Sequence, residues 1–122
     1  MLPFISVAAR VGFNPVTYST EEGGAVTILV QLFDTIARPV MVNFRTVDGS
    51  AVSTFGGDYT QEERTITFQP NGNTVAFIPV QTLTDERAEV TETFTAQLFQ
   101  PSAGLTITED TATVDITDAT GM

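Results

Sequence analysis

The sequence predicts an all-β fold in which two sheets pack face to face. Three observations support this expectation. Val, Ile, Phe and Thr recur with a period of two residues, turn-forming clusters of Gly, Asn, Asp and Pro separate these runs, and helical periodicity is nearly absent. The chain has 122 residues, of which 42% are hydrophobic, so it has the size of one domain and enough apolar side chains to fill one core.

Four strands are expected before residue 70, over residues 16–20, 25–33, 40–45 and 66–68. The second of these shows the clearest pattern, because apolar residues occupy every even position from 26 to 32 while Thr27 and Gln31 lie on the opposite face. This alternation is typical of an antiparallel strand that buries one face and exposes the other. Leu29 and Phe33 are the two apolar residues that interrupt it.

Three further strands are expected over residues 78–80, 94–98 and 112–117. Pro79 has no N–H to donate to a neighbouring strand, so its strand is expected at the edge of a sheet. Seven strands are too many for one flat sheet of this size. We therefore expect a seven-stranded, immunoglobulin-like antiparallel β-sandwich.

The composition excludes several classes of function. Five Arg and no Lys face fifteen acids, and the resulting formal charge of −10 argues against nucleic acid as a partner. The chain contains no Cys and no His, so disulfides, thiolate or imidazole metal sites and Ser-His or Cys-His dyads are all excluded. No stretch approaches the roughly 18 apolar residues of a membrane span, and membrane insertion is not expected. Any bound metal must be held by oxygen.

The densest group of acids lies between two predicted strands and consists of Asp85, Glu86, Glu89 and Glu92. In a sandwich, the loop that holds Asp58 and the end of the last strand at Asp118 can lie at the same pole as this group. Carboxylates this close repel one another, and Ca²⁺, which takes about 6 to 8 oxygen ligands, would relieve that repulsion. The alternative is a solvated acidic loop that holds no ion.

Catalysis is not expected. Asp48, Gly49 and Ser50 would offer an acid beside a nucleophile, but the chain has no His or Lys to act as the base, so this stretch is read as a tight turn. Glu62 and Glu63 could form paired acids with Asp58, as in glycoside hydrolysis. Such sites need a cleft with aromatic sugar platforms, and the sequence contains no Trp.

Six short stretches carry a resemblance to a known family: YSTEEGG (18–24), FRTVDGSA (44–51), GDYT (57–60), TFQP (67–70), Asp85 and Glu89 with ETF (92–94), and ATVDITD (112–118). In motif order and spacing they resemble the Calx-beta domain, over residues 13–118. The seven-stranded sandwich of that family agrees with the fold that the periodicity predicts independently.

The resemblance implies a non-catalytic module, several members of which bind Ca²⁺ at one pole. Members occur in sodium–calcium exchangers and in extracellular adhesion and matrix proteins. Carried over position by position, the resemblance assigns as metal ligands the carboxylates of Asp58, Asp85, Glu89, Glu92 and Asp118 and the backbone carbonyl of Arg87.

The sequence departs from the calcium-sensing members at four positions where they have acids, namely Asn14, Thr84, Ala119 and Thr120. These departures remove much of the charge of a site that holds several ions. Because affinity falls as ligand charge is removed, we expect one Ca²⁺ ion bound weakly, with a Kd of about 10⁻⁴ to 10⁻³ M.

The chain is divided into an N-terminal extension (1–10), the Calx-beta domain (11–119) and a short tail (120–122). The apolar extension is expected to form an edge strand of its own domain or to add to the sheet of a neighbouring copy.

The expected function is that of an extracellular, calcium-binding module of an adhesion or matrix protein. Its expected partners are neighbouring Calx-beta modules, copies of itself, or other cell-surface or matrix proteins. Two alternatives stay open. One is a self-assembling subunit that forms filaments by strand addition without Ca²⁺, and the other is a regulatory calcium sensor of an ion exchanger.

Overall fold

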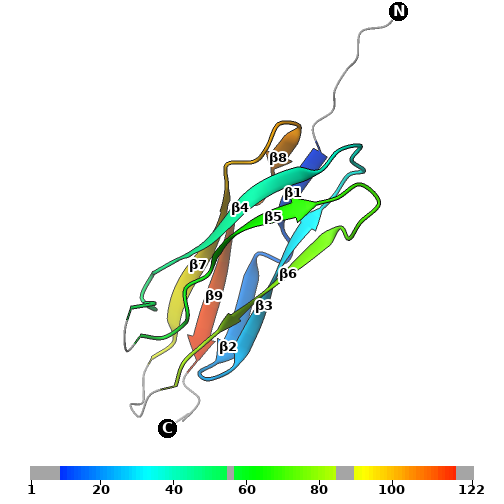
Figure 1. The fold of residues 1–122 in the computed structure, drawn as a ribbon. Coiled ribbons are helices and arrows are strands. Elements are labelled where there is room, and N and C mark those ends of the chain that lie inside the picture. The colour runs from blue at the N-terminus through cyan, green and yellow to red at the C-terminus, as the bar shows by residue number, and fades with distance from the viewer. Residues whose placement is uncertain (1–8, 55–56, 85–89, 118–122) are drawn as a thin grey trace, which may run out of the picture.

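The computed structural model describes residues 9–54, 57–84 and 90–117, which form nine strands and no helix within these ranges. The strands are β1 (Ala9–Phe13), β2 (Thr17–Glu21), β3 (Ala25–Leu32), β4 (Val40–Val47), β5 (Glu63–Phe68), β6 (Val75–Gln81), β7 (Glu92–Phe99), β8 (Leu105–Ile107) and β9 (Thr111–Thr117). They form a four-stranded sheet in the order β6-β3-β1-β8 and a five-stranded sheet in the order β2-β9-β7-β4-β5. The sheets pack face to face (Figure 1), which confirms the predicted sandwich.

The core lies between the two sheets and is built by strict alternation along the strands. In β3, the four even-numbered residues from Val26 to Leu32 are at most 6% exposed, as the sequence pattern predicts. Phe44 of β4 and Phe94 of β7 are completely buried in the same layer. Phe13 packs edge-on against Phe44, with their ring centroids 6.1 Å apart. The core is thus a single apolar layer of branched and aromatic side chains.

The structure contains all seven predicted strands and two more, β1 and β8, so the strand count of seven was too low. β8 has three residues and lies next to β1, from which it is about a hundred residues away along the chain. The N-terminal part of the chain contributes one strand to each sheet, because β1 pairs with β3 whereas β2 pairs with β9. Among the strand pairs of the described residues, β1–β8 and β2–β9 are parallel and the other five are antiparallel.

β6 is the edge of the four-stranded sheet, as Pro79 predicts. Leu32 donates its N–H to the carbonyl of Thr74, and Thr82 donates its N–H to the carbonyl of Gly24. Because the register pairs each residue of β6 with β3 without a bulge, the even-numbered residues of β6 bond to β3 and the odd-numbered ones direct their backbone outward. Pro79 is odd-numbered, so the N–H that proline lacks would have pointed away from the sheet.

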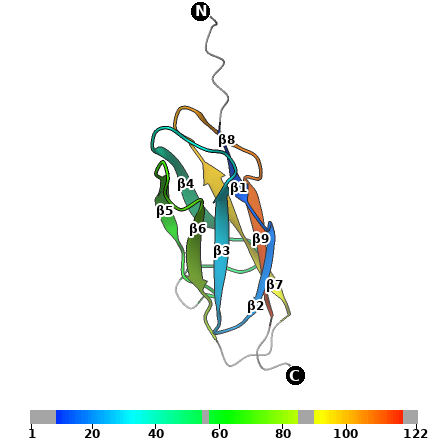
Figure 2. The same ribbon diagram turned by 90° about the vertical axis from the view of Figure 1, so that its right-hand side faces the viewer.

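The loops gather at the two ends of the sandwich (Figure 2). The lower pole contains the β2–β3 turn, the β4–β5 loop, the flanks of the β6–β7 connection and the end of β9. The upper pole contains the start of β1 and the β3–β4, β5–β6 and β7–β8 loops. No helix in the described ranges could cross a membrane. The hypotheses for residues 1–10 stay predictions, since all but Ala9 and Arg10 of this segment lie outside those ranges.

Candidate functional site

The β4–β5 loop lies against the end of β6 at the lower pole. Leu83 donates its N–H to the carbonyl of Asp58 at 2.9 Å, and Tyr59 forms an isolated antiparallel bridge with Thr82. Thr82 is 1% exposed, and its hydroxyl lies 2.6 Å from the carbonyl oxygen of Gly24. These contacts bring Asp58 next to the start of the β6–β7 connection.

The start of β7, the end of β9 and the β2–β3 turn also meet at the lower pole. Glu92, the first residue of β7, lies opposite Ile116 of β9. Glu22 donates its N–H to the carbonyl of Thr117, the last residue of β9, at 2.9 Å. Four separate segments of the chain therefore converge at this end of the molecule.

Two of the predicted ligand residues are described by the structure, and both lie at the lower pole. Asp58 is half-buried, and its Oδ2 accepts the N–H of Val52 at 2.9 Å. Glu92 is also half-buried and begins β7. Both carboxylates are partly withdrawn from water, which favours a cation that takes hard oxygen ligands.

The other four predicted ligands, Asp85, Arg87, Glu89 and Asp118, lie outside the described residues. Residues 84, 90 and 117 flank them in the sequence, and Thr117 has been placed at the lower pole above. Among the described residues, no group of three or more acids lies close enough together to hold a metal ion. The complete ligand set therefore stays a prediction, and it requires the 85–89 loop.

The structure changes two details of the sequence interpretation. Glu22, to which the sequence analysis gave no role at the site, is a half-buried acid one hydrogen bond from the residue that precedes Asp118. Asn14, placed by the resemblance at an acid position of the calcium-sensing members, is not at this pole. Its side-chain amide donates to Oε1 of Gln31 at 2.9 Å. Gln31 lies six residues along β3 from Ala25, the end of this strand at the lower pole, and this corresponds to roughly 20 Å at about 3.4 Å per residue.

A buried tyrosine supports the β4–β5 loop. Tyr59 is 1% exposed and stacks on Phe94, with the ring centroids 3.9 Å apart and the planes 10° apart. Its hydroxyl donates to Oδ1 of Asp48 at 2.5 Å. Burial, reinforced by this bond, raises the pKa of Tyr59 to about 12, and the same bond holds the pKa of Asp48 below its ordinary value.

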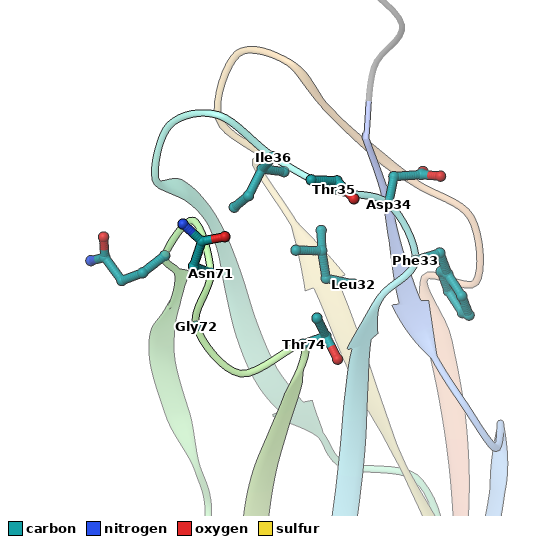
Figure 3. A pocket seen from close by; sticks show the side chains of 9 residues that line it. Leu32, Phe33, Asp34, Thr35, Ile36, Asn71, Gly72 and Thr74 are labelled. Carbon is teal, nitrogen blue, oxygen red and sulfur yellow. The ribbon is translucent and has the colours of Figure 1, made fainter.

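The upper pole has a cavity of about 370 Å³, and Asp34 is the one acid among the described residues that line it. Leu32, Ile36 and Asn71 line it, and Asp34 lies on its far side in Figure 3. Asp34 accepts two hydrogen bonds from the guanidinium of Arg10, each of 3.0 Å. The one acid that lines this cavity is thus already paired with a cation, so the candidate site is the lower pole.

Comparison with known proteins gives a family and several solved relatives. The profile of the Calx-beta domain matches residues 6–120. The chain is similar to the apo form of the Calx CBD1 domain, with 28% sequence identity and a TM-score of 0.83 over 91% of this chain and 97% of that one. The Calx CBD2 domain shares the fold, with a TM-score of 0.78 and 16% identity over 90% of this chain and 86% of that one.

A longer relative contains two such domains in one chain. This is the calcium binding domain CBD12 of CALX1.1, with 28% identity and a TM-score of 0.81 over 88% of this chain and 45% of that one. The present chain therefore spans slightly less than half of the two-domain relative. No curated protein sequence matches the chain.

Proposed function

Because the chain belongs to the Calx-beta domain family, we propose that it is a non-catalytic module that binds Ca²⁺ through carboxylates at its lower pole. The observation that carries this proposal is the convergence of four segments there, two of which present the half-buried acids Asp58 and Glu92. A chain without His or Cys has only oxygen ligands to offer, and Ca²⁺ prefers them.

The residues of this chain fit such an ion in number and kind. Asp58 and Glu92 would supply oxygens from the described segments, and Asp85, Glu89, Asp118 and the carbonyl of Arg87 would complete the set. Bound Ca²⁺ would offset the mutual repulsion of these acids. Glu22, whose backbone bonds to the residue before Asp118, adds negative charge at the same pole.

The solved relatives favour a regulatory calcium-binding domain over an adhesion module. The two-domain relative is by name a calcium binding domain. We therefore propose that the module acts beside a neighbouring Calx-beta domain, in the manner of the calcium-sensor alternative. The affinity for Ca²⁺ distinguishes a sensor from an extracellular module, since sensors bind with a Kd of about 10⁻⁷ to 10⁻⁵ M and extracellular modules with a Kd of about 10⁻⁴ to 10⁻³ M. The departures at residues 84, 119 and 120 predict a Kd weaker than that of typical sensors. A measured Kd of about 10⁻⁴ to 10⁻³ M would therefore replace the sensor role with that of an extracellular module.

The test is a thermal melt of the whole chain in chelator and then in Ca²⁺ from micromolar to about 10 mM. An ion that binds only the folded state stabilises it by about 2.7 kcal/mol at a hundred times its Kd. Asp58→Asn and Asp85→Asn should each weaken binding at least about tenfold, since each removes a charged ligand. Mg²⁺ should not replace Ca²⁺, because it demands a tighter octahedral site.

The matched control is Asp110→Asn. Asp110 is exposed, and its Oδ1 accepts the hydroxyl of Thr111 at 2.9 Å, near the end of the molecule away from Asp58. This variant changes the net charge by the same amount and should leave the calcium response intact. A wild-type melt that does not move up to about 10 mM Ca²⁺ contradicts the proposal. Equal losses in Asp58→Asn and Asp110→Asn would show a response to net charge alone.

A further inference from the structure

From the hydrogen bonds of the β4–β5 loop we infer that residues 48–53 are a positioning element of the calcium site, one that fixes Asp58 relative to Glu92 without contributing a ligand. We call these six residues the brace. The inference rests on the proposed calcium site. It assigns an affinity-setting role to Ser50 and Asp48, which the sequence marked only as a turn.

One end of the brace holds Asp58 at two points. The N–H of Val52 donates to Oδ2 of Asp58 at 2.9 Å, and the N–H of Asp58 donates to the carbonyl of Val52 at 2.6 Å. The first bond orients the carboxylate and the second fixes the backbone that carries it. Asp58 therefore has a defined position before any ion is present.

The other end holds the residue that follows Glu92. The N–H of Ala51 donates to the carbonyl of Thr93 at 3.0 Å, and the N–H of Thr93 donates to Oγ of Ser50 at 2.8 Å. The approach is close, since a Cβ at Gly49 would lie 2.4 Å from the carbonyl oxygen of Thr93. Both backbone groups of Thr93 are thus used by the brace, and Glu92 is held by its neighbour.

The same contact extends to the third ligand-bearing segment. The hydroxyl of Thr93 donates to Oδ1 of Asp115 at 2.8 Å, and Asp115 lies on β9 three residues before Asp118. These bonds join the β4–β5 loop, β7 and β9 into one connected set. Every donor in these bonds is a neutral N–H or O–H group, and the acceptors are a hydroxyl, backbone carbonyls and carboxylates, so none of the bonds requires a cation.

The brace is also fixed to the core. Oδ1 of Asp48 accepts the hydroxyl of Tyr59 at 2.5 Å and the N–H of Ser53 at 3.0 Å. Tyr59 is 1% exposed, and Ala51 in the middle of the brace is completely buried. A loop attached to the core in this way moves little, whereas a loop free of such contacts would have to be ordered when the ion binds.

The consequence is a smaller entropic cost of calcium binding. Ordering flexible segments on association subtracts from affinity, and a rigid support around the ligands removes part of that cost. Losing one hydrogen bond of the brace should then weaken calcium binding by more than the same loss elsewhere in the sandwich. The chain contains a matched bond for this comparison, because Met41 donates its N–H to Oγ of Ser102 at 2.9 Å at the upper pole.

The experiment measures Ca²⁺ affinity by calorimetry and thermal stability in chelator for the wild type, Ser50→Ala, Tyr59→Phe and Ser102→Ala. None of these substitutions changes the net charge. Ser50→Ala and Tyr59→Phe should each raise the Kd for Ca²⁺ about fivefold, the value expected when one hydrogen bond is lost. Ser102→Ala should lower the melting temperature about as much as Ser50→Ala and leave the Kd unchanged.

The outcomes separate this inference from the proposed function. If calorimetry detects no binding of Ca²⁺ to the wild type, the proposed calcium site is itself contradicted. If the wild type binds but Ser50→Ala binds equally tightly, or Ser102→Ala weakens binding to the same extent, the site stands and the brace is overturned. Amide hydrogen exchange is a second readout, in which Ca²⁺ should slow exchange at Thr93 and Val52 but not at Met41. Equal slowing at all three amides contradicts the inference.

Discussion

At each pole of the sandwich a serine hydroxyl accepts the N–H of a strand residue, Ser50 from Thr93 below and Ser102 from Met41 above. The charges around the two bonds differ. At the upper pole Asp34 forms a bidentate pair with Arg10, whereas at the lower pole Asp58 is held by a backbone N–H. The same kind of bond therefore supports a neutralised loop at one end and an acidic loop at the other.

This difference shows how a small domain can position an acid without neutralising it. A carboxylate that is positioned by neutral donors retains its full charge, while one paired with Arg has lost much of its attraction for a second cation. Asp48 and Asp58 are both positioned by neutral donors. Four predictions test the contrast between the two poles.

The largest effect is expected from removing the aromatic ring under the lower pole. Phe94→Ala and Phe44→Ala both delete a completely buried ring and should each destabilise the domain by about 3 to 5 kcal/mol. Phe94 stacks on Tyr59, which holds Asp48, so Phe94→Ala should also weaken calcium binding. Denaturant unfolding and calcium calorimetry would measure both quantities. A similar loss of affinity in Phe44→Ala would show that general destabilisation is sufficient.

The second effect appears at high pH and depends first on the burial of Tyr59 and then on its bond to Asp48. The folded state raises the pKa of Tyr59 from 10.0 to about 12, so it stabilises the neutral phenol. This contribution is complete below pH 10, is lost as the pH rises toward 12, and is about 3 kcal/mol. Spectrophotometric titration of Tyr18→Phe isolates this phenol. Titration near pH 10 in the folded protein would contradict the burial of Tyr59.

A third, smaller effect compares two glycines. Gly49→Ala places a Cβ 2.4 Å from the carbonyl oxygen of Thr93 and should cost about 2 kcal/mol, because that backbone must move. Gly104→Ala at the upper pole meets nothing within 4 Å, but its φ of +83° should cost about 1 kcal/mol. Chemical denaturation would rank the two. Only Gly49→Ala should lower calcium affinity. If Gly104→Ala lowered it and Gly49→Ala did not, the role of the brace would be refuted.

The smallest effect concerns the exposed pair of Arg10 and Asp34. The bonds from Arg10 hold the pKa of Asp34 below its ordinary 3.8, so the contribution of the pair is present above that value and lost as the pH falls below it. Asp34→Asn should lower the melting temperature slightly at neutral pH, less in high salt because ions screen an exposed pair, and progressively less as the pH falls below 3.8. Calcium binding should be unchanged. Melts at several pH values provide the check.

The strands could be predicted from the sequence because each of the seven has its own alternation of apolar and polar residues. β8 was not predicted although its Leu-Thr-Ile alternates like residues 66–68 and 78–80, because its place in a sheet depends on pairing with β1, which joins segments about a hundred residues apart. The position of Asp58 and Glu92 at one end was also predictable, because strand connectivity in a sandwich determines which loops share a pole.

The side-chain contacts that support the loops could not be predicted in the same way. The bond from Tyr59 to Asp48 joins two residues of one irregular loop, and no period or propensity indicates it. Asn14 was misplaced because motif spacing gives the order of residues along the chain but not the point at which the first strand leaves one sheet for the other. Sequence reasoning therefore located the pole of the site but not the bonds that support it.

Pro79 has a consequence for chains that contain several such domains, as the two-domain relative does. Tethering raises the effective concentration of one domain near the next to the millimolar range, where open sheet edges of similar sequence can pair with each other. A proline whose missing donor faces outward interrupts the row of groups that a misplaced strand would need, and it costs the domain none of its own ladder bonds. Each copy can then fold beside its neighbour without exchanging strands, and a single residue provides this protection against strand exchange.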